Sequence, residues 1–199
     1  MTPAELRERL AAPWRHGEHA DLRGVTCEGR LDLSGLEVAG FDLTGARFPD
    51  GIDAQGARFL GLSWLREVRF GGLADFSGAV FLNDARFEGA RFDREARFSG
   101  AEFRGIGRFD GARFEAGTDF SGAVGYGNCS LAQVSMQGPA SFRDSEWLGG
   151  LWCQDAALPA DADLTETQVH GRLWLRGARQ GNGALKPGAF GMSFGYSYT

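Results

Sequence analysis

Apolar side chains in this chain recur every five or six residues. The clearest run consists of ten phenylalanines, separated alternately by six and five residues: Phe70, Phe76, Phe81, Phe87, Phe92, Phe98, Phe103, Phe109, Phe114 and Phe120. An α-helix repeats every 3.6 residues and a β-strand every two, so neither accounts for this spacing. A fixed longer period indicates stacked units, each of which buries its apolar side against its neighbours.

The same spacing extends to both sides of the phenylalanines. Apolar or small residues occupy nearly every position from Leu22 to Leu175, and we take Tyr126 as the apolar residue that follows Phe120 in this series. The residue two places before each centre is small in most units and often alanine. No charged residue occupies either of these inward positions, although 24% of all residues are charged. The pattern predicts one continuous domain over residues 20–175.

Individual units resemble a known repeat. The segments Ala85–Gly89 (ARFEG) and Ala90–Arg94 (ARFDR) each consist of alanine, a polar residue, phenylalanine and two variable residues, the last often glycine. These units resemble those of the pentapeptide-repeat family. The resemblance implies an all-β fold, a right-handed quadrilateral β-solenoid with one unit per side and about four units per coil. The extra residue in alternate units predicts coils of about 22 residues with bulged corners.

The N-terminal residues predict a short capping helix. Thr2 is a suitable N-cap, Pro3 suits the first helical position, and Glu5 completes a capping box. Leu6 and Leu10 lie four residues apart on one face, which we expect to cover the open end of the first coil. We also expect Trp14 to help close that end. Residues 1–19 are thus predicted to form a capping helix and connector.

Residues 176–199 are predicted to form a separate tail, because the repeat spacing stops near residue 176. Glycines alternate with aromatic residues there, and no charged residue follows Lys186. Two tryptophans at outward positions precede the tail. The candidate interface and tail residues are Trp152, Trp174, Phe190, Phe194, Tyr196 and Tyr198. They favour three alternatives: a tail that folds back over the tryptophans, a homodimer through the C-terminal end, or a segment that a partner enzyme binds or modifies.

Outward charges form columns, because residues about 22 apart stack on one face. The arginine column consists of Arg47, Arg69, Arg91 and Arg113. It predicts either a docking strip for an acidic partner or a ladder of ion pairs with Asp93 and Glu115. The acidic column on the next face consists of Asp32, Asp53, Asp75 and Asp119, interrupted by Arg97.

The family resemblance gives the acidic column a possible meaning. Several pentapeptide-repeat proteins resemble DNA in shape and charge, bind type II topoisomerases such as gyrase and protect them from inhibitors. Residues 20–175 carry 23 Asp and Glu against 15 Arg, which is a modest acidic excess. DNA mimicry is therefore an alternative function for this chain.

Catalytic chemistry finds little support in the sequence. His16, His19 and His170 are not spaced with carboxylates or cysteines as catalytic or metal-binding groups are. All three cysteines fall at inward positions, where we expect buried thiols: Cys27, Cys129 and Cys153. We expect no catalytic residue, metal or cofactor, no direct contact with nucleic acid, no membrane segment and a cytoplasmic location. The sequence predicts a non-catalytic protein-binding or scaffold module.

Overall fold

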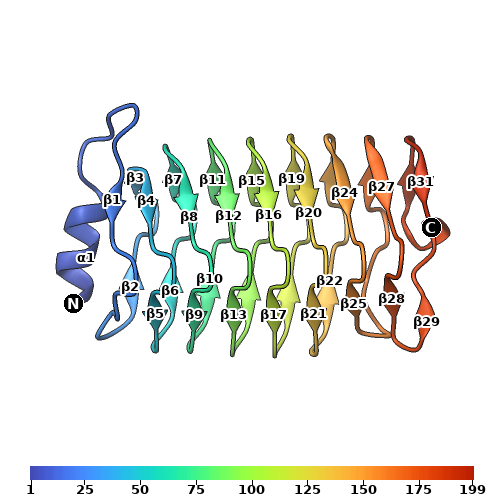
Figure 1. Ribbon diagram of the computed structural model, residues 1–199, viewed down its shortest axis with the longest axis horizontal. Helices are drawn as coiled ribbons and strands as arrows, with labels where there is room; N and C mark the ends of the chain where they lie inside the picture. The colour runs from blue at the N-terminus through green and yellow to red at the C-terminus, as the bar shows by residue number, and fades with distance from the viewer.

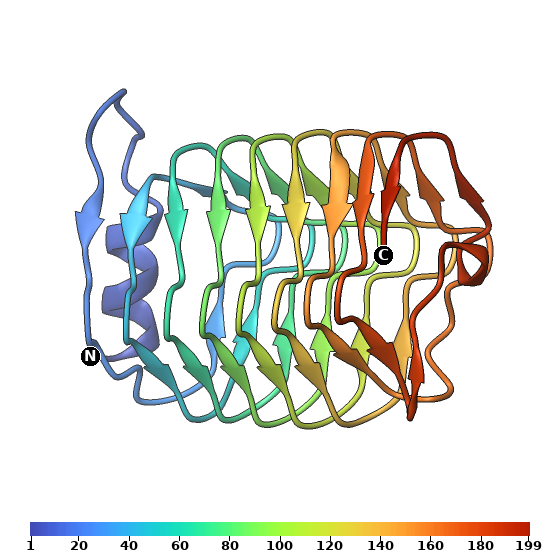
Figure 2. The ribbon, with the colours of Figure 1, turned by 45° about the vertical axis from the view of Figure 1, so that its right-hand side comes forward.

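The computed structural model describes residues 1–199 as a β-solenoid of about eight turns, preceded by one short helix (Figure 1). Each turn passes through four sheets in a fixed order, which we call sheets I, II, III and IV. Strands from successive turns lie side by side in each sheet (Figure 2). The four-sided solenoid that the resemblance implies is confirmed.

Nearly all strands are two residues long. Sheet I contains β1 (Ala20–Asp21), β4 (Phe41–Asp42), β8 (Ser63–Trp64), β12 (Ala85–Arg86), β16 (Gly107–Arg108), β20 (Cys129–Ser130), β24 (Gly150–Trp152), β27 (Arg172–Trp174) and β31 (Ser197–Tyr198). Sheet II contains β5 (Arg47–Phe48), β9 (Arg69–Phe70), β13 (Arg91–Phe92), β17 (Arg113–Phe114), β21 (Ser135–Met136), β25 (Ala157–Leu158), β28 (Arg179–Gln180) and β29 (Gly183–Ala184). Sheet III contains β2 (Leu31–Asp32), β6 (Ile52–Asp53), β10 (Ala74–Asp75), β14 (Ala96–Arg97), β18 (Thr118–Asp119) and β22 (Ala140–Ser141). Sheet IV contains β3 (Glu37–Val38), β7 (Arg58–Phe59), β11 (Val80–Phe81), β15 (Glu102–Phe103), β19 (Val124–Gly125), β23 (Glu146–Trp147), β26 (Gln168–Val169) and β30 (Met192–Ser193).

The alternation of five and six residues reflects two kinds of corner. Strand pairing joins Arg69 to Arg91 and Phe70 to Phe92, so one coil takes 22 residues, as predicted. The corners after sheets I and III use five-residue units and contain one residue with positive φ, which is glycine in most coils, for example Gly89 (φ 65°) and Gly100 (φ 63°). Glycine adopts this left-handed conformation without steric cost. The corners after sheets II and IV take the sixth residue.

Five of the left-handed corners carry a side chain in place of glycine, and one of them provides a stability test. Glu67 has a φ of 55° and an exposed side chain. Left-handed backbone costs a non-glycine residue roughly 1–2 kcal/mol, part of which is offset by the greater flexibility of glycine in the unfolded chain. We expect Glu67→Gly to raise the free energy of unfolding by about 0.5–1 kcal/mol. Urea denaturation would measure the change, and a destabilised variant would contradict this account of the corner.

Most corners after sheet IV use glycine, with Asn83 as an exception, because the backbones of successive coils approach closely there. A Cβ atom at Gly105 would lie 2.6 Å from the carbonyl carbon of Asn83, and one at Gly171 would lie 2.6 Å from that of Gly149. The last glycine of this column, Gly195, stacks on Gly171 in the same way. Any side chain at these positions would push two coils apart.

The interior is a set of stacked phenylalanine rings. The Phe92 ring is fully buried and nearly parallel to those of Phe70 and Phe114, with centroid separations of 4.9 Å and 4.5 Å. Phe98, from the adjacent sheet, meets Phe92 edge to face at 6.0 Å. Each ring therefore contacts rings above, below and beside it, and this dense packing supplies the core.

The prediction that Tyr126 lies at a buried centre is wrong. Sheet IV pairs Phe103 with Gly125 and Gly125 with Trp147, so Gly125 occupies the inward position and Tyr126 lies outside, 49% exposed. The buried indole of Trp147 fills the space beside Gly125. A Cβ atom added at Gly125 would lie 2.8 Å from Cε3 of this indole. A side chain from one coil thus fills the gap left by its neighbour.

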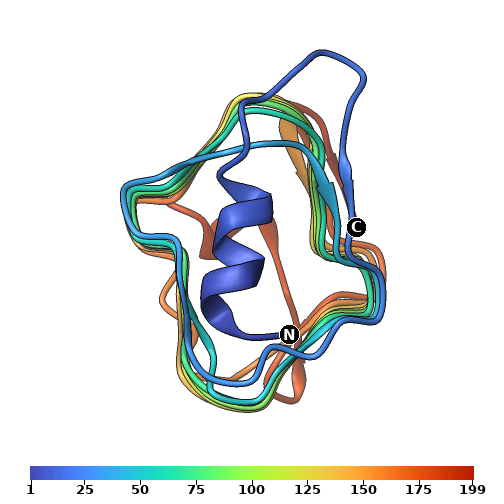
Figure 3. The same cartoon turned by 90° about the vertical axis from the view of Figure 1, so that its left-hand side faces the viewer.

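The N-terminal helix forms as predicted and lies across the end of the solenoid (Figure 3). Helix α1 (Pro3–Leu10) begins at the N-cap Thr2, whose hydroxyl accepts from the Glu5 amide, while the Glu5 carboxylate accepts from the Thr2 amide. Leu6 and Leu10 are fully buried against the first coil. The connector then bulges outward, and Trp14 lies on the outside, 38% exposed, so the expectation that it helps close the end is wrong.

Stacking continues beyond residue 175. Strands β28, β30 and β31 pair in parallel with β25, β26 and β27, and the short 3₁₀ helix η1 (Pro187–Ala189) lies between β29 and β30. Leu185 and Phe190 are buried, at 3% and 6% exposure. The tail therefore adds a further, less regular turn to the solenoid, although its sequence lacks the repeat spacing.

Candidate protein-binding surfaces

The arginine column on sheet II is partly neutralised by its own acidic neighbours. Asp93 accepts from the Nε atoms of Arg69 (2.7 Å) and Arg91 (2.8 Å), and Arg91 also pairs with Glu115 at 3.1 Å. Partial burial acts to raise the pKa of Asp93, but the hydrogen bonds from the two arginines outweigh it, so this pKa lies below its usual value. The column is therefore in part the predicted ladder of ion pairs, which joins three coils.

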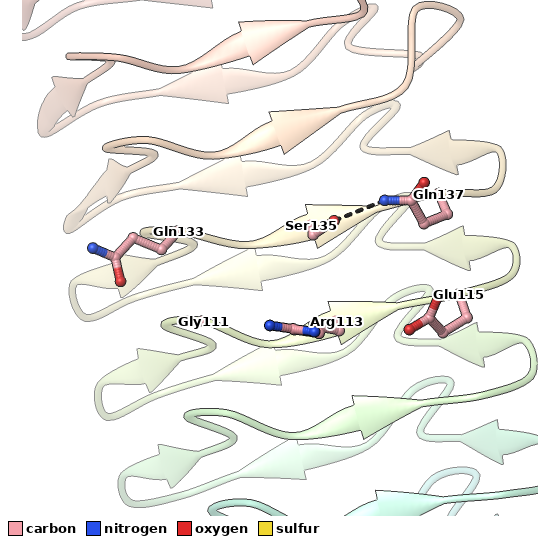
Figure 4. A pocket seen from close by; sticks show the side chains of 6 residues that line it. All are labelled: Gly111, Arg113, Glu115, Gln133, Ser135 and Gln137. Atoms are coloured by element: carbon pink, nitrogen blue, oxygen red, sulfur yellow. Dashed lines mark hydrogen bonds between the residues drawn. The ribbon is translucent and has the colours of Figure 1, made fainter.

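The two outer arginines of this column, Arg47 and Arg113, make no ion pair. Arg113 lies beside a shallow polar groove on sheet II, lined also by Gln133, Ser135 and Gln137 (Figure 4). The Gln137 amide donates to the Ser135 hydroxyl at 2.9 Å. Gly111 and Glu115 complete the lining of the groove, in which the Arg113 guanidinium has no ion-pair partner.

The acidic column on sheet III mainly stabilises its own turns. Asp75 accepts from the Ser77 amide (3.0 Å) and hydroxyl (2.6 Å), and Asp119 bonds to Ser121 in the same way. Hydrogen bonds from the Ser34 hydroxyl and amide likewise hold the pKa of Asp32 below its usual value. Such turns, in which an aspartate bonds to the backbone two residues later, compete well with water for the carboxylate.

The outward position of Asp75 in the sequence had indicated an exposed side chain, but Asp75 is buried. Its side chain is only 2% exposed. Gln55 from the previous coil donates to it at 3.0 Å, and Arg97 from the next coil lies 3.5 Å away. Asp53 and Asp119 are half-buried, and only Asp32 is exposed. The column presents much less free carboxylate to a partner than its sequence indicates.

The tail folds back onto the tryptophan column of sheet I, which is one of the three predicted alternatives. The Tyr198 ring stacks on Trp174 at 4.5 Å, and Trp174 lies parallel to Trp152 at 6.3 Å. Both tryptophans are half-buried. Homodimerisation through the C-terminal end stays a prediction, which the mass of the protein in solution would test.

The large exposed apolar side chains are confined to the half of the solenoid that sheets IV and I form. They lie on the connector, on sheet IV, at its corner with sheet I, or on the last strand of sheet I, in the upper half of Figure 1. The set consists of Trp14, Leu62, Tyr126, Met192, Phe194, Tyr196 and Tyr198. We call this surface the apolar side. Sheets II and III carry no such residue, so this distribution distinguishes one half of the solenoid from the other.

Polar side chains on the apolar side lie close to one another. Glu102 pairs with Arg104 at 2.9 Å, and Glu146 lies 3.0 Å from Nε2 of His170. Half-buried aliphatic residues stack in successive coils at the corner after sheet IV, including Leu60, Leu82 and Leu148. The sequence pattern did not reveal this surface, because its residues come from sheet positions and corner positions that alternate with charged residues along the chain.

The histidines and cysteines are not gathered into a site. His16 and His19 are exposed on the connector, and His170 lies on sheet IV, about seven coils away. No group of three or more His, Cys, Asp or Glu side chains is arranged to hold a metal ion. No helix is both long and apolar enough to span a membrane.

The three thiols are free and buried, as predicted. Burial raises the pKa of Cys129 and that of Cys153 to about 12. Because the thiolate is the reactive form, we expect neither residue to react with a disulfide reagent at pH 8 while the protein is folded. Addition of urea should release both thiols. Rapid reaction of either cysteine under native conditions would contradict the core arrangement of these coils.

Comparison with known proteins agrees with the coil geometry. A model of pentapeptide repeats, nine copies long, matches residues 65–111 and 76–124, the segment in which the phenylalanine ladder is most regular. This segment carries the repeat of the pentapeptide-repeat family. The repeat fold is consistent with a non-catalytic protein-interaction module.

Among solved structures, this chain is similar to HetL, a pentapeptide repeat protein involved in heterocyst differentiation regulation from the cyanobacterium Nostoc sp. strain PCC 7120. The two share 16% sequence identity with a TM-score of 0.24, over 100% of this chain and 94% of that chain. No curated protein matches the sequence.

Proposed function

We propose that this protein is a non-catalytic scaffold that binds another protein along its apolar side. The observation that carries the proposal is the confinement of Leu62, Tyr126 and Phe194, exposed by 43%, 49% and 60%, to that side together with the other large exposed apolar residues. Contiguous exposed apolar surface rimmed by polar groups is typical of protein interaction sites, and aromatic residues are enriched there.

The shape of the solenoid supports the same function. Stacked coils form a rigid and regular surface, so little conformational entropy is lost when a partner docks. Sheet II is the second candidate surface, because Arg47 and Arg113 have no ion-pair partner there. Its central charges are already paired, however, and exposed ion pairs contribute little to affinity. The apolar side is therefore the better supported of the two.

Site-specific crosslinking in the native host would test the proposal. The photoreactive residue p-benzoylphenylalanine would replace Tyr126 on the apolar side, and Arg113 on sheet II in a matched control. Both positions are exposed. We expect a discrete crosslinked protein at position 126 and none, or far less of it, at position 113. The opposite result would assign binding to the arginine column.

DNA mimicry is less well supported as a function. A mimic needs a continuous row of free carboxylates, whereas Asp75 is buried and Asp32, Asp75 and Asp119 accept hydrogen bonds within their own turns. A gyrase supercoiling assay, with and without a quinolone, would test it directly. Modification of the tail is also less well supported, because Ser197 and Tyr198 are paired within sheet I.

A further inference from the structure

The connector between α1 and β1 forms a pocket against the solenoid, and the proposed scaffold function does not require this pocket. Its volume is about 270 Å³, and it opens to solvent beside the corner between sheets IV and I. The side chains that line it come from the connector and from two successive coils: Trp14, His16, Glu18, His19, Leu62 and Asn83. The connector bulges beyond the outline of the stacked coils (Figure 3), so it is shaped by its own turn and contacts.

A tight turn sets the geometry of this pocket. The Glu18 amide donates to the Arg15 carbonyl at 3.1 Å, and Gly17 between them has a φ of 82°. A positive φ at the third residue of a four-residue turn is the requirement of a type II turn, which glycine meets. The turn therefore holds His16 and the Glu18 carboxylate on either side of Gly17.

Trp14 can pack against the coil because Gly61 has no side chain. A Cβ atom at Gly61 would lie 2.7 Å from Nε1 of Trp14. Because Gly61 has none, the indole rests directly over the coil backbone. The His16 ring then stands almost perpendicular to the indole, at 87°, with ring centroids 6.1 Å apart. Two aromatic rings thus form adjoining walls.

The charges around this pocket favour a cation. Trp64, on the same side, already has the Arg66 guanidinium 4.9 Å from its ring centre, whereas no cation lies over Trp14. The Glu18 carboxylate has only a distant partner, Arg15 at 3.9 Å, and both side chains are mostly exposed. An aromatic face beside a carboxylate attracts ammonium groups through the ring quadrupole and direct charge. The net charge of −5 adds a general attraction for cations.

We propose that this pocket binds an alkylammonium group, with Trp14 and His16 as its aromatic walls and Glu18 as its counter-ion. The group can belong to a free amine or to a lysine side chain of a bound protein. This proposal does not depend on the proposed protein-binding function, because a free amine could occupy the pocket without a bound protein.

Ligand titrations by NMR would test the proposal. The probes are choline, its neutral isostere 3,3-dimethylbutanol, and N-acetyl-trimethyllysine methylamide. We expect saturable shifts of the Trp14 indole N–H signal, assigned by its loss in Trp14→Phe, with choline and with the lysine derivative. The neutral isostere should bind about five- to tenfold more weakly, because it lacks the charge. Tighter binding of the lysine derivative than of choline would identify a protein side chain as the ligand, and the reverse a free amine.

Variants would confirm which groups act. Glu18→Gln and Trp14→Ala should each weaken choline binding about fivefold or more, as measured from the ligand signals. Glu115→Gln removes the same charge on sheet II and should leave binding unchanged. Thermal unfolding would show that each variant is folded, since Trp14 and Glu18 lie outside the core. Equal binding of choline and its neutral isostere, or the absence of saturation with both ammonium probes, would overturn the proposal.

Discussion

Replacing Phe92 with alanine is expected to lower the free energy of unfolding by about 3–5 kcal/mol. The ring is fully buried in the middle of the stack and contacts Phe70, Phe98 and Phe114. Its removal loses the transfer free energy of the ring and leaves a cavity that the neighbouring rings cannot fill, since each is held in its own coil. Urea denaturation followed by circular dichroism would measure the loss.

A matched control is Phe194→Ala, at the other end of the exposure range. The Phe194 ring is 60% exposed, so its removal should change stability far less. A loss below about 1 kcal/mol for Phe92→Ala would contradict the buried ladder, because ordinary surface substitutions stay within about 0.5 kcal/mol. Equal losses for both variants would contradict the assignment of inward and outward positions.

Asp75→Ala is expected to lower the free energy of unfolding by about 2–3 kcal/mol. The buried carboxylate accepts hydrogen bonds from Ser77 in its own turn and from Gln55 in the previous coil. Its removal takes the acceptor from three hydrogen bonds, and Arg97 loses its neighbouring charge. Thermal and urea unfolding would both report the change.

Asp32→Ala separates the turn itself from the contact between coils. Asp32 makes the same hydrogen bonds to Ser34, at 2.9 and 2.7 Å, but is exposed and accepts from no other coil. Its loss should be clearly smaller than that of Asp75. If both variants were as stable as the original protein, the acidic column would be free for another role, and DNA mimicry would gain support.

The fold could be predicted because one period controls it. Each inward position must be apolar or small, and the spacing of Phe70, Phe92 and Phe114 gave the 22-residue coil that the strand register confirms. The helix was predictable for a local reason, since the Thr2 and Glu5 capping box is complete within four residues. Neither inference needed knowledge of contacts distant in the sequence.

The error at Tyr126 arose because an apolar residue was preferred to the strict alternation of six and five residues, which after Phe120 points to Gly125. Gly125 can occupy this inward position because Trp147 from the next coil fills the space beside it. The structural role of the acidic column, by contrast, had a signal in the sequence. Asp32, Asp75 and Asp119 each precede a serine by two residues, which is the spacing of a side-chain-stabilised turn.

The candidate surfaces were only partly predictable. The columns on sheets II and III followed from the coil length, but which arginines remain unpaired depends on side-chain geometry across three coils. The apolar side could not be predicted, because Trp14 lies outside the repeat and Leu62 occupies a corner. Their proximity depends on the bulge of the connector and on the absence of a side chain at Gly61.

The pairing of Gly125 with Trp147 limits how this protein can evolve. In the regular part of the ladder every coil presents phenylalanine to the next, so a 22-residue segment could be duplicated or lost in one genetic event without disturbing the interior. The coil of Gly125 is different, because its gap is matched to one indole in its successor. These two coils are expected to be inherited together, whereas a single coil of the regular phenylalanine ladder can be gained or lost.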